Sequence, residues 1–304
     1  MSHCILRNSR ISWTSSFKLL LTSRKMASTL SHTPASLGPL HPAKAQTAAV
    51  KPSVAKSIGI RVKDPLDHEA PAILHEPRNY NRQQANESAV VLISGAGGGV
   101  SGPAGIYPSL ADKFSLLLNI PCIRLDYRQP AREKYCTADV VAAFDYLATH
   151  YSSKNFVIVG WSFGGSPCFT VAAREPERVR GVATVASQTA GTEGVRQLSP
   201  RPVLLLHGTG DTCLSPACSQ TLFRQYGEKG ERELKLFEGD DHGLSRNAVE
   251  VERLIFHFAA RCLGLGGMVD EPMKEEAAKD LAGSRKERVS EMQEGHDLEG
   301  GERL

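Results

Sequence analysis

Short apolar runs alternate with stretches of helical periodicity between residues 56 and 265. Eight of the runs have the character of β-strands, at residues 58–62, 72–74, 89–94, 121–125, 156–160, 179–185, 203–207 and 233–237. Helical patterns lie between several of them and after the last, at residues 104–118, 137–151, 164–174 and 251–262. Strands that alternate with helices are typical of βαβ units, so the predicted fold class is α/β, with a mainly parallel sheet flanked by helices.

The two ends of the chain differ from this region in composition. Residues 1–55 are rich in Ser, Thr, Ala and Pro, which predicts a disordered arm. Residues 266–304 are charged, interrupted by glycine and without an apolar stripe, which predicts a disordered, solvated tail. The domain itself is therefore predicted over residues 56–265, and its roughly 210 residues are enough for one sizeable core.

Charge and cysteine content argue against several functional classes. The net charge is +3, but no acidic residue precedes Asp64, so the basic excess lies in the arm. A nucleic-acid partner is not expected, because that would need a basic face interleaved with aromatic residues. The seven cysteines include no C-x-x-C pair, which favours reduced thiols in an intracellular protein and predicts no metal site.

The composition of the N-terminal arm indicates where in the cell the protein is expected. No run approaches the length of about 18 apolar residues that a membrane span needs, so stable membrane insertion is not expected. The arm lacks acids and carries Ser and Arg, which resembles an organelle transit peptide. The expected location is cytoplasmic, or mitochondrial if residues 1–25 act as a transit segment. A second candidate start lies at Met26.

The strongest motif is G-x-S-x-G, which follows the apolar run at residues 156–160 and precedes a helical pattern. In a sharp turn from strand to helix, side chains two before and two after the serine would collide, which explains Gly160 and Gly164. Such a turn exposes the serine hydroxyl at the start of a helix, where the dipole favours negative charge. Ser162 is therefore the predicted nucleophile.

A serine hydroxyl needs a base, and hydrolases with this turn carry serine, acid and histidine in that chain order. Asp211 follows the run at residues 203–207, and His242 follows the run at residues 233–237. Because active residues lie beyond the carboxyl ends of parallel strands, the three are expected to meet at one sheet edge. Asp211 is the predicted acid and His242 the predicted base.

Other residues compete for these roles. His207 is interpreted as a structural residue beneath Asp211, since the base follows the acid in this order. Asp240 and Asp241 are interpreted as solvated turn residues, and Asp126 is an alternative acid.

An oxyanion hole needs backbone N–H groups, one of them from the residue after the nucleophile, which is Phe163. The second donor should come from the glycine-rich loop at residues 95–99, where Ala96 is preferred and Gly97 is next.

These motifs resemble those of the α/β-hydrolase superfamily, and the chain is similar to its dienelactone-hydrolase-like group of small hydrolases. The resemblance implies an eight-stranded sheet, no metal and no organic cofactor. The loop after residues 89–94 departs from the usual pattern, because it begins Ser94-Gly95 instead of His-Gly. Only residues 186–201 separate two late strands, which predicts a minimal lid, a rather open site and specificity from loop residues such as Tyr127, Arg128 and Arg132.

The predicted function is a serine hydrolase that cleaves a carboxylic ester, thioester or lactone of a small-molecule acyl substrate through an acyl-enzyme. One alternative is a catalytically silent binding protein with the same fold. The other is a dinucleotide-binding Rossmann domain, because residues 97–102 satisfy G-x-G-x-x-G and Asp126 follows about 20 residues later. That glycine pattern begins three residues after Ser94, later than the Rossmann fingerprint requires, and it leaves Ser162 and His242 unexplained.

Overall fold

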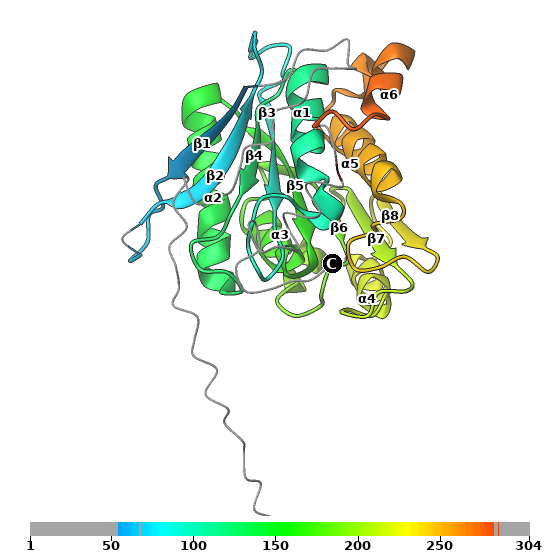
Figure 1. The fold of residues 1–304 in the computed structure, drawn as a ribbon. Coiled ribbons are helices and arrows are strands. Elements are labelled where there is room, and N and C mark those ends of the chain that lie inside the picture. Colours follow the sequence, from blue (N-terminus) through cyan, green and yellow to red (C-terminus); the bar gives the residue numbers. More distant parts are fainter. Residues whose placement is uncertain (1–53, 67, 283–284, 286–304) are drawn as a thin grey trace, which may run out of the picture. The chain divides into compact units, whose positions relative to one another are not determined.

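A computed structural model gives the structure of the protein and describes residues 54–66, 68–282 and 285. One sheet of eight strands crosses this part of the chain (Figure 1), as the sequence predicts. Its strands are β1 (Val54–Ile60), β2 (Ala70–Glu76), β3 (Ser88–Ile93), β4 (Cys122–Leu125), β5 (Asn155–Trp161), β6 (Val179–Val185), β7 (Val203–Gly208) and β8 (Arg232–Phe237).

The strand order in the sheet is β1-β2-β4-β3-β5-β6-β7-β8. β2 is antiparallel to both of its neighbours, and every pairing from β4 to β8 is parallel. The carboxyl ends of β3, β5, β7 and β8 therefore lie along one edge of the sheet, where the predicted site residues were expected to meet.

Helices cover both faces of this sheet (Figure 1). One apolar cluster joins α1 (Tyr107–Leu117) and α5 (Ala248–Cys262) to the sheet, and another joins α2 (Glu133–Tyr151), α3 (Gly165–Arg174) and α4 (Ala217–Tyr226). Side chains alternate between the faces along β3, since Val90 and Leu92 join the first cluster and Val91 and Ile93 the second. A strand buried on both faces explains the continuous apolar run in the sequence.

Between β6 and β7 the described chain contains only one short 3-10 helix, η4 (Glu193–Gln197). This agrees with the predicted minimal lid.

The described part of the predicted tail, residues 266–282, is not a solvated coil. It forms a helical turn, Gly266–Met268, and the short helix α6 (Glu271–Ala277). The Asp270 carboxylate accepts a hydrogen bond from the Met273 N–H, and Ala277, Leu281 and Ala282 are buried. Three buried residues are too few to leave a helical stripe in the sequence, which explains the wrong prediction.

Two predicted helix starts also differ. α2 begins at Glu133, four residues before Thr137, and the acidic side chain of Glu133 suits the positive end of the helix. α5 begins at Ala248, three residues before the predicted pattern at 251–262, and the Asn247 amide before it donates to the Asp240 carboxylate. No helix among the described residues is long and apolar enough to cross a membrane.

Candidate active site

The turn after β5 has the geometry that the G-x-S-x-G motif predicts. Ser162 has a φ of 55°, a left-handed conformation that costs a non-glycine residue energy and clusters at functional sites. A Cβ on Gly160 would lie 2.6 Å from the Gly164 carbonyl oxygen, so Gly160 is needed for the reason the sequence suggested. A Cβ on Gly164 would instead meet the Ser94 carbonyl oxygen, also at 2.6 Å. The need for glycine at position 164 therefore comes from the neighbouring chain at Ser94.

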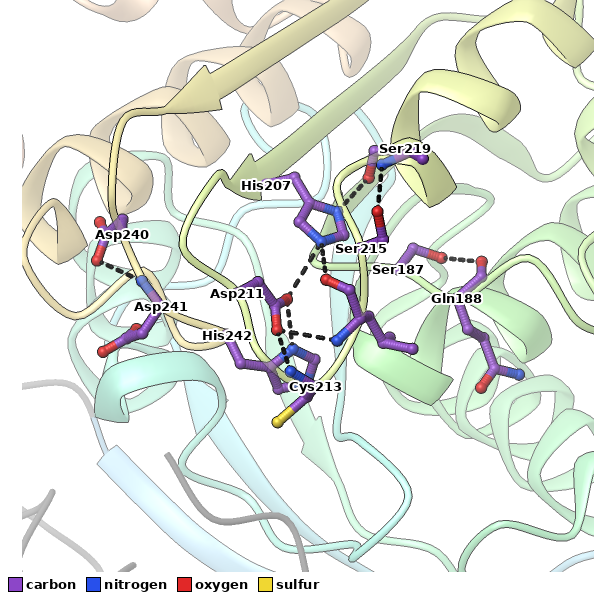
Figure 2. A network of polar contacts seen from close by, with 12 residues as sticks. Ser187, Gln188, His207, Asp211, Cys213, Ser215, Ser219, Asp240, Asp241 and His242 are labelled. Atoms are coloured by element: carbon purple, nitrogen blue, oxygen red, sulfur yellow. Dashed lines mark hydrogen bonds and ion pairs between the residues drawn. The ribbon is translucent and has the colours of Figure 1, made fainter.

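The predicted acid and base are in contact (Figure 2). Nδ1 of His242 lies 2.7 Å from Oδ2 of Asp211, and because a carboxylate only accepts, the imidazole donates this hydrogen bond. The backbone N–H groups of Cys213 and Leu214 donate to the other oxygen, Oδ1, at 2.7 and 2.9 Å. Burial alone would raise the pKa of Asp211, but the Leu214 N–H and the His242 imidazole outweigh it and lower the pKa. Asp211 is thus held as a carboxylate that orients the imidazole.

His207 supports the acid from the side away from His242 (Figure 2). Its Nε2 lies 3.1 Å from both the Asp211 carboxylate and the Leu214 carbonyl oxygen, so Nε2 carries the proton, and Nδ1 accepts from the Ser219 hydroxyl at 2.7 Å. Burial lowers the pKa of His207, which keeps the ring neutral. These contacts agree with the interpretation of His207 as a structural residue.

The loop that carries His242 is tied to the turn that carries Ser162. The indole Nε1 of Trp161 donates to the His242 carbonyl oxygen at 3.1 Å, and the two rings lie 5.7 Å apart. Because Trp161 directly precedes Ser162, this bond places the base loop beside the nucleophile turn. The structure therefore brings Ser162, Asp211 and His242 to the same edge of the sheet.

Asp240 is not the solvated turn residue that the sequence suggested. It is fully buried, and its carboxylate accepts hydrogen bonds from the backbone N–H groups of Asp241, Arg246 and Asn247. Asp240 thereby fixes the loop between β8 and α5, which contains His242. The sequence signal was available, since a carboxylate just before a helix commonly binds free N–H groups there.

The predicted oxyanion loop lies against the serine turn, because β3 and β5 pair in parallel. Ala96 is half-buried, whereas Gly97 and Phe163 are buried. Ala96, Gly97 and Phe163 remain the predicted oxyanion donors.

The residues that hold this loop were given other roles in the predictions from the sequence. Oδ1 of Asp126 accepts hydrogen bonds from the N–H groups of Gly99 and Tyr127, both at 2.7 Å, and so fixes the glycine-rich loop. The Tyr127 hydroxyl donates to the Ser94 carbonyl oxygen at 3.0 Å, and its ring meets Phe163 edge-on at 5.9 Å. Asp126 and Tyr127 therefore clamp the glycine-rich loop instead of binding a nucleotide ribose or acting as the acid.

Arg128 is not placed to select a substrate. Its guanidinium is fully buried between the carboxylates of Asp64 and Asp139. Both ion pairs lie inside the fold, so the guanidinium is engaged within the protein. Arg132 is exposed at the start of α2.

The site is less open than a minimal lid suggested. Ser162 exposes 4% of its surface and His242 exposes 3%. Cys213, by contrast, is exposed beside Asp211.

One group in the site has the residue types of a metal site, which the sequence did not predict. Donor atoms of Asp211, Cys213 and His242 all lie within 4.8 Å of one another. The cluster is invisible in the sequence, because His242 lies 31 residues after Asp211 and no Cys-His motif links them.

Comparison with known proteins supports the α/β-hydrolase fold. A family model described as the alpha/beta hydrolase fold matches residues 88–229. The described part of the chain has the α/β-hydrolase fold. No match was found among curated proteins. The α/β-hydrolase fold also excludes the Rossmann alternative, since β2 is antiparallel and the Asp126 carboxylate is engaged within the protein.

Solved structures with this fold include a dienelactone hydrolase from Anabaena variabilis, at 16% identity and a TM-score of 0.56, covering 68% of this chain and 96% of that one. Est1E from Butyrivibrio proteoclasticus is 15% identical with a TM-score of 0.57, covering 70% and 100%. XC6422 from Xanthomonas campestris, described as a serine hydrolase without a lid, is 12% identical with a TM-score of 0.51, covering 70% and 97%. At these identities the similarity concerns the fold of the α/β-hydrolase domain.

Proposed function

We propose that the protein is a serine hydrolase that cleaves a carboxylic ester, with Ser162 as nucleophile, Asp211 as acid and His242 as base. The hydrogen bond of 2.7 Å between His242 Nδ1 and Asp211 Oδ2 carries this proposal. It fixes the tautomer in which Nε2 is free of hydrogen and can accept a proton, as a general base requires.

The proposed reaction is acyl transfer in two steps. His242 takes the hydroxyl proton of Ser162 while Oγ attacks the carbonyl carbon of the ester, and the alcohol then leaves with that proton. Water activated by His242 cleaves the acyl-enzyme and releases the acid. The N–H groups of Phe163 and Ala96, with Gly97 as the alternative to Ala96, would receive the oxyanion, and one such donor typically contributes about 3 kcal/mol to transition-state stabilisation.

The relatives support a small acyl substrate. The structures named above include a dienelactone hydrolase and a serine hydrolase without a lid, both with the present fold. Thioesters and lactones use the same acyl chemistry, so they belong in the substrate screen beside esters. The burial of Ser162 and His242 favours compact acyl groups over polymeric ones.

The test is hydrolysis of short-chain p-nitrophenyl esters by wild type, Ser162→Ala, His242→Ala and Ser166→Ala. Ser166 is a matched control, because it lies one helical turn after Ser162 and its hydroxyl donates to the Gly191 carbonyl oxygen. We expect kcat to fall by about 10⁴-fold or more in the first two variants and to change little in the control. An active Ser162→Ala variant would refute the proposal. An inactive but folded wild type would favour a silent binding protein.

A further inference from the structure

The loop after β7 places an exposed thiol beside the buried acid–base pair. Cys213 follows Asp211 by two residues, and its backbone N–H donates to the Asp211 carboxylate at 2.7 Å. This turn folds the chain over the carboxylate and keeps the thiol near it. The sulfur, a carboxylate oxygen and a ring nitrogen of His242 all lie within 4.8 Å of one another.

We propose that Asp211, Cys213 and His242 bind a zinc ion, and that bound zinc switches the enzyme off. Zinc accepts sulfur, nitrogen and oxygen ligands at about 2.3, 2.0–2.1 and 2.0–2.2 Å. Those lengths put tetrahedral ligand atoms about 3.3–3.6 Å apart. The three donors lie within 4.8 Å of one another, so no pair has to close by much more than about 1 Å. Cys213 is exposed and can move by rotating its side chain.

The donor chemistry selects zinc over the abundant hard cations. A thiolate and an imidazole favour zinc, whereas magnesium and calcium prefer oxygen ligands. A coordinating thiol loses its proton, so one thiolate and one carboxylate balance the two charges of the ion. The fourth position would remain open to water, as in other sites with three protein ligands.

The surroundings also resemble those of a metal site. Nε2 of His207 contacts the Asp211 carboxylate at 3.1 Å, and the Leu214 N–H donates to its other oxygen at 2.9 Å. Such outer partners orient a metal-binding carboxylate. The exposed Cys213 gives the ion a route to side chains that are otherwise buried.

Inhibition follows from the shared residues, and this part rests on the proposed hydrolase function. If zinc binds Nε2 of His242, it occupies the lone pair that accepts the serine proton. If it binds Nδ1, it replaces the hydrogen bond to Asp211 that orients the ring. In both geometries His242 stops acting as a base, and a chelator should restore activity.

The test separates metal binding from hydrolysis. Cobalt(II) is added to the full chain as a spectroscopic probe, in wild type, Cys213→Ser and Cys218→Ser. Cys218 is the matched control, five residues further on and half-buried in α4. A thiolate-to-cobalt absorption band should appear in wild type and the control and be absent from Cys213→Ser. X-ray absorption of zinc-loaded wild type should show one sulfur at about 2.3 Å beside nitrogen and oxygen ligands, a readout that needs no variant.

Ester hydrolysis is then measured with and without zinc in each variant. Zinc should inhibit wild type and Cys218→Ser, and Cys213→Ser should need at least about 10-fold more zinc, while magnesium has no effect. A cobalt band without hydrolysis would overturn the proposed function and leave the zinc site standing. Hydrolysis without a cobalt band, or with the same band in Cys213→Ser, would overturn the zinc site alone.

Discussion

Replacing Gly160 with alanine should damage both the stability and the activity of the protein. The added Cβ would lie 2.6 Å from the Cys168 sulfur and 2.6 Å from the Gly164 carbonyl oxygen. Ordinary contacts between non-bonded heavy atoms lie at about 3.5–4.0 Å, so the overlap is about 1 Å. The sulfur can rotate away, but the carbonyl belongs to the backbone of the serine turn and can only move with it.

The magnitude follows from that displacement. Overpacking of a buried site typically costs about 1–3 kcal/mol in the free energy of unfolding. Moving a reacting group by about 1 Å can cost about 10²-fold in rate, which corresponds to about 2.7 kcal/mol on the activation barrier. Gly160→Ala should therefore remain folded in water but lose most of its ester hydrolysis.

The assay is urea unfolding together with kcat on a p-nitrophenyl ester. Gly267→Ala is the matched control, because a Cβ there meets no atom within 4 Å, and it should change the unfolding free energy by less than about 0.5 kcal/mol. Wild-type stability and rate in Gly160→Ala would show that the turn tolerates a side chain, and would refute the explanation given for the motif.

Three further predictions concern residues around the site. Arg128→Met leaves the Asp139 carboxylate buried without its ion-pair partner, so the free energy of unfolding measured in urea should fall by about 3–5 kcal/mol. The preference between acidic and neutral esters should not change, and a changed preference would show that Arg128 contacts the substrate. Tyr127→Phe removes the hydrogen bond to the Ser94 carbonyl oxygen and should lower the free energy of unfolding by about 0.5–1.5 kcal/mol. An unchanged unfolding curve would show that this bond does not hold the glycine-rich loop. His207→Phe removes a hydrogen-bond partner of the Asp211 carboxylate and should lower kcat by about 5- to 150-fold with little change in KM. His207→Gln should recover part of the lost kcat. Equal rates in the two variants would argue against a positioning role for His207.

The sequence predicted the features that depend on local pattern. Each strand buried on both faces left an apolar run, and the serine turn left two glycines at fixed offsets. Knowing that β7 and β8 are parallel neighbours was enough to expect Asp211 and His242 at one edge of the sheet. Their contact at 2.7 Å follows from that topology.

The features that failed depend on contacts between distant segments. Asp240 is an exception, because its partners lie within seven residues and a carboxylate just before a helix is a local signal. The burial of Leu281 depends on α1, where the Ser109 hydroxyl oxygen accepts the Leu281 N–H at 2.9 Å. The proximity of Cys213 to His242 likewise appears only when the two strand ends are brought together.

If Ser162 is an activated nucleophile, a covalent serine-directed reagent should label it. Wild type, Ser162→Ala and Ser166→Ala are treated with a fluorophosphonate, and the modified peptide is located by mass spectrometry. One adduct is expected on Ser162 in wild type and in Ser166→Ala, and none in Ser162→Ala. An adduct on another residue, or no adduct on folded wild type, would contradict the proposed role of Ser162.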